Sequence, residues 1–285
     1  MEVFSYMKTK KILITVLTVL LLIAFGVSAF QVIRYLVESS QQKAINQQLS
    51  DMVANAQTTA ATTEAAETTA ATTEPAETTE ATTEPTGPTE PKMLPGYADV
   101  YALNNDMVGW IKIEGTTLDN PVMQTPSNRD YYLNRSFEKE HNAHGSIYAW
   151  AEADINAPSD NITLFGHNMK DGTMFAALAD YTEKETWEKN PLIFFDTLYE
   201  YQTYKIFAVF ATSANIGEGF TYHKFVDAEN QEAFDKFVAR CKKLAYYDTG
   251  ITPVYGDKLL CLSTCEYSHD NGRLVVCAVR ITHDK

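Results

Sequence analysis

The stretch KLLCLSTCEYSHDNGRLVVCAVRIT, residues 258–282, contains two apolar runs separated by a short polar segment. In the first run Cys261, Ser263 and Cys265 alternate with other residues, so their side chains share one face of a predicted strand. The polar segment holds the turn-forming residue types Asn, Asp and Gly. A hairpin here returns Arg273, at the start of the second run, toward the thiol of Cys265.

The residues before this hairpin predict further short strands and few helices. Two helices are expected, a short one over residues 97–107 and a long one over residues 228–247 with Asp227 as its N-cap. The strand segments are VGWIKIEGTTLDNPVMQ (108–124), GSIYAW (145–150), NITLFGH (161–167), PLIFFD (191–196) and YQTYKIFAVFAT (201–212). This pattern indicates a mainly β domain with peripheral helices, built as a barrel or a sandwich.

An uncharged apolar run covers residues 12–33 and is long enough to cross a bilayer as a helix. Three lysines precede it and only Arg34 follows closely, so residues 1–11 are expected in the cytoplasm and everything after residue 34 outside. The alternative is a cleaved signal peptide, because residues 27–29 (VSA) resemble a cleavage site. The run is longer than a secretory signal needs, which favours an uncleaved anchor.

A low-complexity segment separates this anchor from the folded part of the chain. After a juxtamembrane segment, residues 34–55, a ten-residue Thr/Ala/Glu/Pro repeat occupies residues 58–87. Without large apolar residues it cannot offset the entropy of ordering, so we expect residues 56–91 to be a disordered stalk of at most about 110 Å. A linker with no length requirement fits equally well. Residues 92–285 form the predicted folded domain.

Composition excludes several classes of function. The 285 residues are 45% hydrophobic and 21% charged, which is typical of a globular protein. The net charge of −14 opposes binding to nucleic acid. The four cysteines form no C-x-x-C pair and no zinc-ligand spacing, so neither a thioredoxin-like motif nor a structural zinc site is indicated.

Three residues stand where strands meet loops and carry reactive groups. Cys265 ends a strand, His167 directly follows another, and Arg273 begins the strand after the cysteine. A thiol with a nearby proton carrier is a nucleophile, and a guanidinium can donate to a developing oxyanion. On spacing alone, however, a cysteine at a strand end is more often structural. The residue pattern by itself therefore leaves both interpretations open.

The motifs around these residues resemble those of class B sortases, the membrane-anchored cysteine transpeptidases of Gram-positive bacteria. Leu262-Ser263-Thr264-Cys265 stands where that family has its T-L-x-T-C core. The matching segments, together spanning most of residues 97–283, are GWIKIEGTTLDNPVMQ (109–124), YYLNRSFEKEHNAHGSIY (131–148), NITLFGHNMKDGTMFAAL (161–178) and LSTCEYSHDNGRLVVCAVR (262–280). The resemblance implies a closed, mostly antiparallel β-barrel of about eight strands, with an N-terminal helical lead-in and a long helix before the cysteine strand.

The resemblance also implies a role for each residue of the motif. Cys265 is the expected nucleophile, His167 the general acid/base and Arg273 the residue that orients substrate and stabilises the oxyanion. Arg280 lies seven residues further along the same strand, about 23 Å away, so both arginines cannot adjoin Cys265. Arg273 stands at the motif position and is the one expected there.

The substrate-binding residues implied by the resemblance are Leu133, Phe220, Thr221, Ser263 and Glu266. For Leu133 and Phe220, a place in the barrel core is an equally good interpretation.

The implied activity is cleavage of a C-terminal sorting signal of the N-P-x-T-[NG] type after threonine, through a thioester on the cysteine. Transfer then goes to an amine of a peptidoglycan precursor or a pilin. Sorting-signal-bearing surface proteins and these amines are the expected partners. No cofactor is implied, and no carboxylate cluster matches the calcium sites of some other sortases. A stalked non-catalytic adhesin and a secreted cysteine peptidase remain alternatives.

Overall fold

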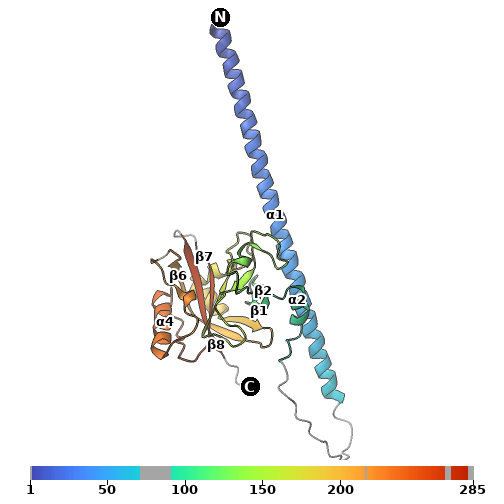
Figure 1. The fold of residues 1–285 in the computed structure, drawn as a ribbon, viewed down its shortest axis with the longest axis vertical. Coiled ribbons are helices and arrows are strands. Elements are labelled where there is room, and N and C mark those ends of the chain that lie inside the picture. Colours follow the sequence, from blue (N-terminus) through green and yellow to red (C-terminus); the bar gives the residue numbers. More distant parts are fainter. Residues whose placement is uncertain (1, 71–90, 216, 267–270, 282–285) are drawn as a thin grey trace, which may run out of the picture. The chain divides into compact units, whose positions relative to one another are not determined.

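The computed structural model describes residues 2–70, 91–215, 217–266 and 271–281. The chain divides into two units, residues 1–43 and residues 44–285. Helix α1, Glu2–Ala70, begins in the first unit and ends in the second (Figure 1).

The first unit is the apolar part of α1. Its large hydrophobic side chains are exposed on every side of the helix from Leu13 to Val37. The helix is long and apolar enough to cross a membrane. It is therefore compatible with a single membrane anchor.

The end of α1 differs from the sequence-based expectation. The helix continues to Ala70, whereas we expected a disordered chain from Ala56 onward. Alanine and glutamate favour helix, and the first proline of the repeat is Pro75, so nothing in residues 56–70 forbids a helical backbone. The rest of the predicted stalk, residues 71–90, lies outside the described residues.

The second unit contains a closed eight-strand barrel, which decides between the barrel and the sandwich. Its strands follow the order β1-β2-β3-β4-β7-β8-β6-β5, and β5 pairs with β1 to close it. Neighbours are antiparallel except for β2–β3 and β4–β7, which are parallel. The strands are β1 (Met107–Lys112), β2 (Asp119–Met123), β3 (Ile147–Ala149), β4 (Asn161–Phe165), β5 (Leu192–Thr197), β6 (Thr203–Ser213), β7 (Leu259–Glu266) and β8 (Gly272–Ile281).

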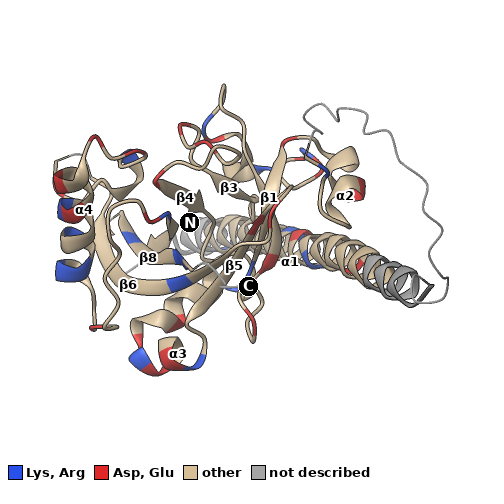
Figure 2. Cartoon of the chain, turned by 90° about the horizontal axis from the view of Figure 1, so that it is seen from below, with Lys and Arg blue, Asp and Glu red and all other residues tan. Residues whose placement is uncertain are grey.

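The helices lie at the periphery of this barrel (Figure 1). Besides α1 they are α2 (Tyr97–Leu103), α3 (Lys184–Lys189), α4 (Gln231–Leu244) and the 3-10 helices η1 (Tyr131–Asn134), η2 (Ala176–Thr182) and η3 (Tyr222–Lys224). Figure 2 shows acidic and basic positions interspersed along α3 and α4. In α4 the acidic Glu232 falls in the first turn and two lysines in the last, which suits the helix dipole.

The N-cap of α4 is Asn230, not Asp227. The Asn230 side chain accepts a hydrogen bond from the backbone N–H of Ala233. Asp227 accepts instead from the backbone N–H of Asp160, which joins the segment before α4 to the start of β4. The prediction that Asp227 caps the helix was wrong, because its side chain makes a long-range hydrogen bond with Asp160 instead.

Alternate side chains along β7 and β8 belong to two different hydrophobic clusters. Leu260, Leu262 and Val276 point into the barrel. Cys261, Val275 and Cys277 point outward. These outward side chains pack beneath α4, against residues such as Phe234 and Phe237. The outer face of β7 and β8 is thus a second, covered hydrophobic layer, and it leads along the strands to Cys265.

The part of α1 from Ala44 onward belongs to the barrel unit. Leu49 and Val53 are buried in a cluster with Tyr97 and Trp110, and Ser50 Oγ donates to Asp119 Oδ2 at 3.0 Å. Gly96 has a φ of +87°, and an added Cβ would meet the Val53 carbonyl oxygen at 2.8 Å. The folded unit therefore begins well before residue 92, the boundary expected from composition.

Candidate active site

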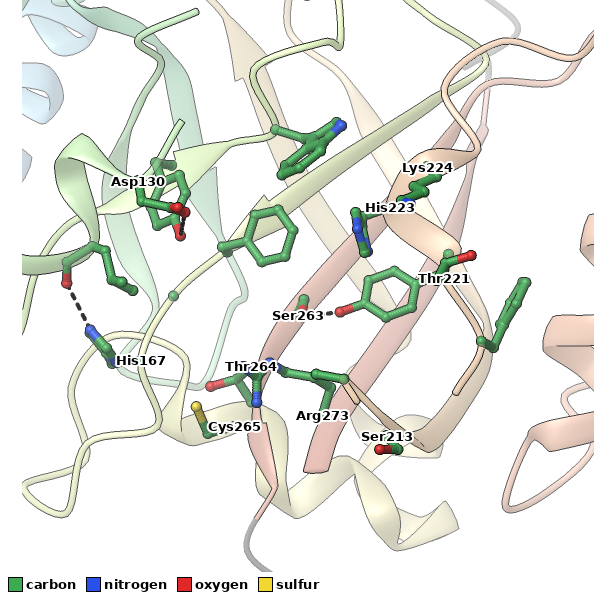
Figure 3. Close-up of a pocket in the computed structure, with 18 of the residues that line it drawn as sticks. Asp130, His167, Ser213, Thr221, His223, Lys224, Ser263, Thr264, Cys265 and Arg273 are labelled. Carbon is green, nitrogen blue, oxygen red and sulfur yellow. Dashed lines mark hydrogen bonds between the residues drawn. The ribbon is translucent and has the colours of Figure 1, made fainter. Parts of the chain in front are cut away.

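Parallel pairing of β4 with β7 brings His167 beside Cys265. In this register Phe165 lies opposite Ser263, and the Gly166 N–H donates to the Ser263 carbonyl at 3.2 Å. Both chains run in the same direction, so His167, two residues beyond Phe165, arrives next to Cys265, two residues beyond Ser263. Figure 3 shows the two side chains at one end of a pocket.

Antiparallel pairing of β7 with β8 brings Arg273 to the same place. Cys265 and Arg273 are direct partners in the ladder, and their side chains lie close together in Figure 3. Arg280 is at the other end of β8, where it hydrogen-bonds the Glu200 carboxylate. Arg273 is therefore the arginine beside Cys265, and Arg280 lies at the far end of the strand, as the length of the strand predicted.

The His167 ring is held in one tautomer. Its Nε2 lies 2.8 Å from the carbonyl oxygen of Leu133, and because a carbonyl only accepts, Nε2 carries the proton. Nδ1 is then the nitrogen that remains for Cys265. The neighbouring Asn168 side chain donates to the Cys265 carbonyl at 3.3 Å, which ties the histidine loop to the cysteine strand.

The two half-buried groups shift each other in opposite directions. The hydrogen bond to His167 lowers the pKa of the Cys265 thiol, against the opposing effect of burial, and the charge of Arg273 lowers it further. The same hydrogen bond raises the pKa of His167, while burial and Arg273 act against the rise. Both shifts act in the direction of a thiolate facing an imidazolium, and the thiolate is the reactive form of a cysteine nucleophile.

A buried hydrogen bond between His144 and Asp171 supports the loop that carries His167. His144 is fully buried, and its Nε2 lies 2.9 Å from Oδ2 of Asp171. Asp171 Oδ1 also accepts from the hydroxyl and the N–H of Thr173. The loop after β4 closes on itself, since the Phe175 N–H donates to the His167 carbonyl at 2.9 Å. These contacts fix the backbone on which the histidine stands.

Cys265, His167 and Arg273 line a pocket of about 510 Å³ on the outer face of β7 and β8. Four of the predicted substrate-binding residues line it, namely Leu133, Phe220, Thr221 and Ser263. Leu133 and Phe220 are only half-buried, so they face the pocket and not the barrel core. Glu266 ends β7, but its side chain lies outside the described part of the chain.

Sequence reasoning missed Tyr222. Its hydroxyl lies 2.5 Å from Ser263 Oγ, and both residues are buried and line the floor of the pocket. The only sequence signal was its position next to Thr221. An aromatic wall was missed too: Trp150 meets the His223 ring at 4.9 Å between centroids, and Phe165 lies beside both. These residues come from three separate segments, so no local pattern joined them.

Comparison with known proteins gives a consistent result. The model of the Sortase domain matches residues 111–281. Sortase B of Staphylococcus aureus is 34% identical over 188 residues, which are 65% of this chain and 74% of that protein. Sortase B of Listeria monocytogenes is 31% identical over 180 residues, 62% of this chain and 71% of that one.

Solved structures agree with these matches. The chain superposes on a Staphylococcus aureus sortase B–substrate complex with a TM-score of 0.61 and 32% identity, covering 67% of this chain and 87% of that one. For Clostridium perfringens sortase B the TM-score is 0.58 at 30% identity, with 65% of this chain and 100% of that chain covered.

Proposed function

The chain belongs to the sortase family as a class B cysteine transpeptidase, and we propose that it cleaves a C-terminal sorting signal of the N-P-x-T-[NG] type after threonine. The acyl group passes to an amine of a peptidoglycan precursor or of a pilin. The observation that carries this proposal is the convergence of Cys265, His167 and Arg273 at one end of the pocket.

In the first half of the proposed reaction, the Cys265 thiolate attacks the carbonyl carbon of the signal threonine. The carbonyl oxygen becomes negative, and the Arg273 guanidinium beside the thiol is placed to donate to it. His167 gives its Nδ1 proton to the nitrogen of the leaving residue, because Nε2 remains bonded to the Leu133 carbonyl. The C–N bond breaks, and a thioester remains on Cys265.

In the second half, an amine attacks the thioester carbon. Nδ1 of His167, which is now unprotonated, takes the proton that the amine loses when it forms the new bond. The C–S bond then breaks and returns Cys265 as a thiolate opposite an imidazolium. Transfer wins over hydrolysis where the amine is held at the thioester and water is excluded, and this separates a transpeptidase from a peptidase.

The hollow beside these residues suits an extended apolar peptide. Its walls include the aromatic side chains of Tyr148, Phe165 and Phe220. The sorting signal contains a proline, whose ring has no N–H to donate and can pack against aromatic faces. We assign Leu133, Phe220 and Thr221 to this peptide site, with Ser263 on its floor and Glu266 at the end of β7.

We place the catalytic domain outside the cell, anchored by α1. Support comes from the apolar helix near the N-terminus and from the three lysines before it. Protease added to wall-stripped cells should remove the domain while the full-length chain fractionates with membranes. A soluble form beginning near Ala29 would show signal-peptide cleavage instead.

The direct test incubates the full-length chain in detergent with peptides bearing candidate sorting signals, with and without added amines. Mass spectrometry should detect a thioester on Cys265 and an amide product that requires the amine. Cys265→Ala should abolish both, and Cys241→Ala, a matched change at a buried thiol away from the pocket, should retain both. Normal turnover by Cys265→Ala contradicts the proposal, and a product independent of amine indicates a peptidase.

A further inference from the structure

Three of the four cysteines lie together, away from the catalytic thiol. Cys261 on β7, Cys277 on β8 and Cys241 on α4 are each 0% exposed and belong to the hydrophobic layer between the barrel and α4. The proposed reaction uses none of them. Their Sγ atoms are in contact: Cys261 Sγ lies 2.6 Å from Cys277 Sγ, and Cys241 also reaches the Cys277 thiol.

The strand register makes one of these pairs suitable for a covalent bond. Cys261 and Cys277 are direct partners in the antiparallel ladder between β7 and β8. Directly opposite residues in such a ladder have Cα atoms about 4.5–5.5 Å apart, inside the roughly 4.4–6.8 Å range of disulfides. Both side chains point to the same outer face, beneath α4. The ladder therefore places the two cysteines at a separation that a disulfide can span.

We propose that Cys261 and Cys277 form a cross-strand disulfide in the mature enzyme. The proposal rests on the extracellular location given above, because disulfides form and persist outside the cytoplasm. The oxidant is of the disulfide class, either a small-molecule disulfide or a thiol–disulfide oxidoreductase. The bond fastens β7 and β8, the two strands that carry Cys265 and Arg273.

The reaction proceeds by two exchanges. The Cys261 thiolate attacks one sulfur of the oxidant's disulfide, which forms a mixed disulfide and releases the first thiolate. The Cys277 thiolate then attacks Cys261 Sγ and releases the second. The protein loses two protons and two electrons, and the oxidant gains both to become two thiols.

Burial decides when this reaction occurs. In the folded chain, burial raises the pKa of both thiols, so few thiolates are present and no oxidant reaches them. The bond therefore forms during folding, before α4 covers the sheet. Cys265 differs on both counts, because it borders the pocket and its pKa is lowered. The disulfide leaves Cys265 as the accessible reactive thiol.

The bond also bears on the active site. Cys261 precedes Cys265 by four residues and Cys277 follows Arg273 by four, so the two ladder pairs lie on the same face of the same two strands. A slip of one residue between β7 and β8 would separate Cys265 from Arg273. A covalent link between Cys261 and Cys277 forbids that slip.

The test counts thiols on the full-length chain. Chain isolated from membranes is denatured in N-ethylmaleimide without reductant, digested and analysed by mass spectrometry. A second sample is unfolded in reductant, refolded in detergent with oxidised and reduced glutathione, and treated in the same way. We expect two alkylated cysteines, Cys241 and Cys265, and one linked peptide pair containing Cys261 and Cys277.

Variants separate this bond from other pairings and from catalysis. Cys277→Ala should lose the linked peptides, whereas Cys241→Ala and Cys265→Ala should keep them. In the Cys265→Ala background, the refolded oxidised chain should melt about 5–10 °C above the same chain in dithiothreitol. Because that background has no catalytic thiol, the result is independent of the proposed transpeptidase activity.

The outcomes are distinct. Four alkylated cysteines in both samples, or a linkage of Cys241 to Cys277, would overturn the proposal. Linkage in both samples supports it. Linkage only after refolding in glutathione would show that the two thiols can pair, but it would overturn the proposed bond in the mature enzyme.

Discussion

The hydrogen bond between Tyr222 and Ser263 gives a double-mutant prediction on the floor of the pocket. The two hydroxyls are 2.5 Å apart, and the residues are 3% and 1% exposed. Tyr222→Phe leaves the Ser263 hydroxyl buried without this partner, and Ser263→Ala does the same to the tyrosine. Each single change should therefore lower the free energy of unfolding by about 1–3 kcal/mol.

The double variant removes both polar groups together and leaves neither orphaned. It should be destabilised by less than the sum of the single changes, with a coupling energy of about 1–2 kcal/mol. For a folded unit of this size, each kcal/mol corresponds to roughly 2–4 °C in Tm. Thermal and urea unfolding of the full-length chain in detergent, followed by tryptophan fluorescence, measures all four proteins of the cycle.

The same four proteins separate a structural role for Ser263 from direct contact with the peptide. If the serine only supports Tyr222, KM for a sorting-signal peptide should change equally in Tyr222→Phe and in the double variant. A strictly additive cycle would refute the proposed coupling. A KM increase for Ser263→Ala that is undiminished in the Tyr222→Phe background would show that the serine binds substrate itself.

Other predictions concern the catalytic residues and their support. Arg273→Lys keeps the charge but loses the forked donor geometry, so the peptide-cleavage rate should fall by roughly 10²–10³ while Tm changes little. Arg280→Lys should lower the cleavage rate much less. A larger loss in Arg280→Lys than in Arg273→Lys would refute the role given to Arg273. Activity should fall at low pH as the Cys265 thiolate is protonated and at high pH as the His167 imidazolium loses its proton, and an NMR titration should show a lower pKa for His167 in Cys265→Ala than in the wild type. Asp171→Asn, which weakens the support of the histidine loop, should lower kcat more than it raises KM; unchanged kcat would contradict that positioning role.

Much of this molecule could be predicted from local sequence. The alternation of residues 258–282 predicted two strands, and both the strands and the shared face of Cys261, Ser263 and Cys265 are confirmed. The apolar run after the first lysines predicted a long helix, which is also present. Side-chain period and apolar length are properties of a short segment, so a short segment is enough to reveal them.

Other features depended on contacts between distant segments. The pairing of β4 with β7, which brings His167 to Cys265, joins residues nearly one hundred positions apart. The Tyr222–Ser263 bond and the Asp227 contact that displaced the expected helix cap are also long-range. Only the tertiary structure decides these neighbours, because the side-chain period of one segment does not reveal which distant segment packs against it.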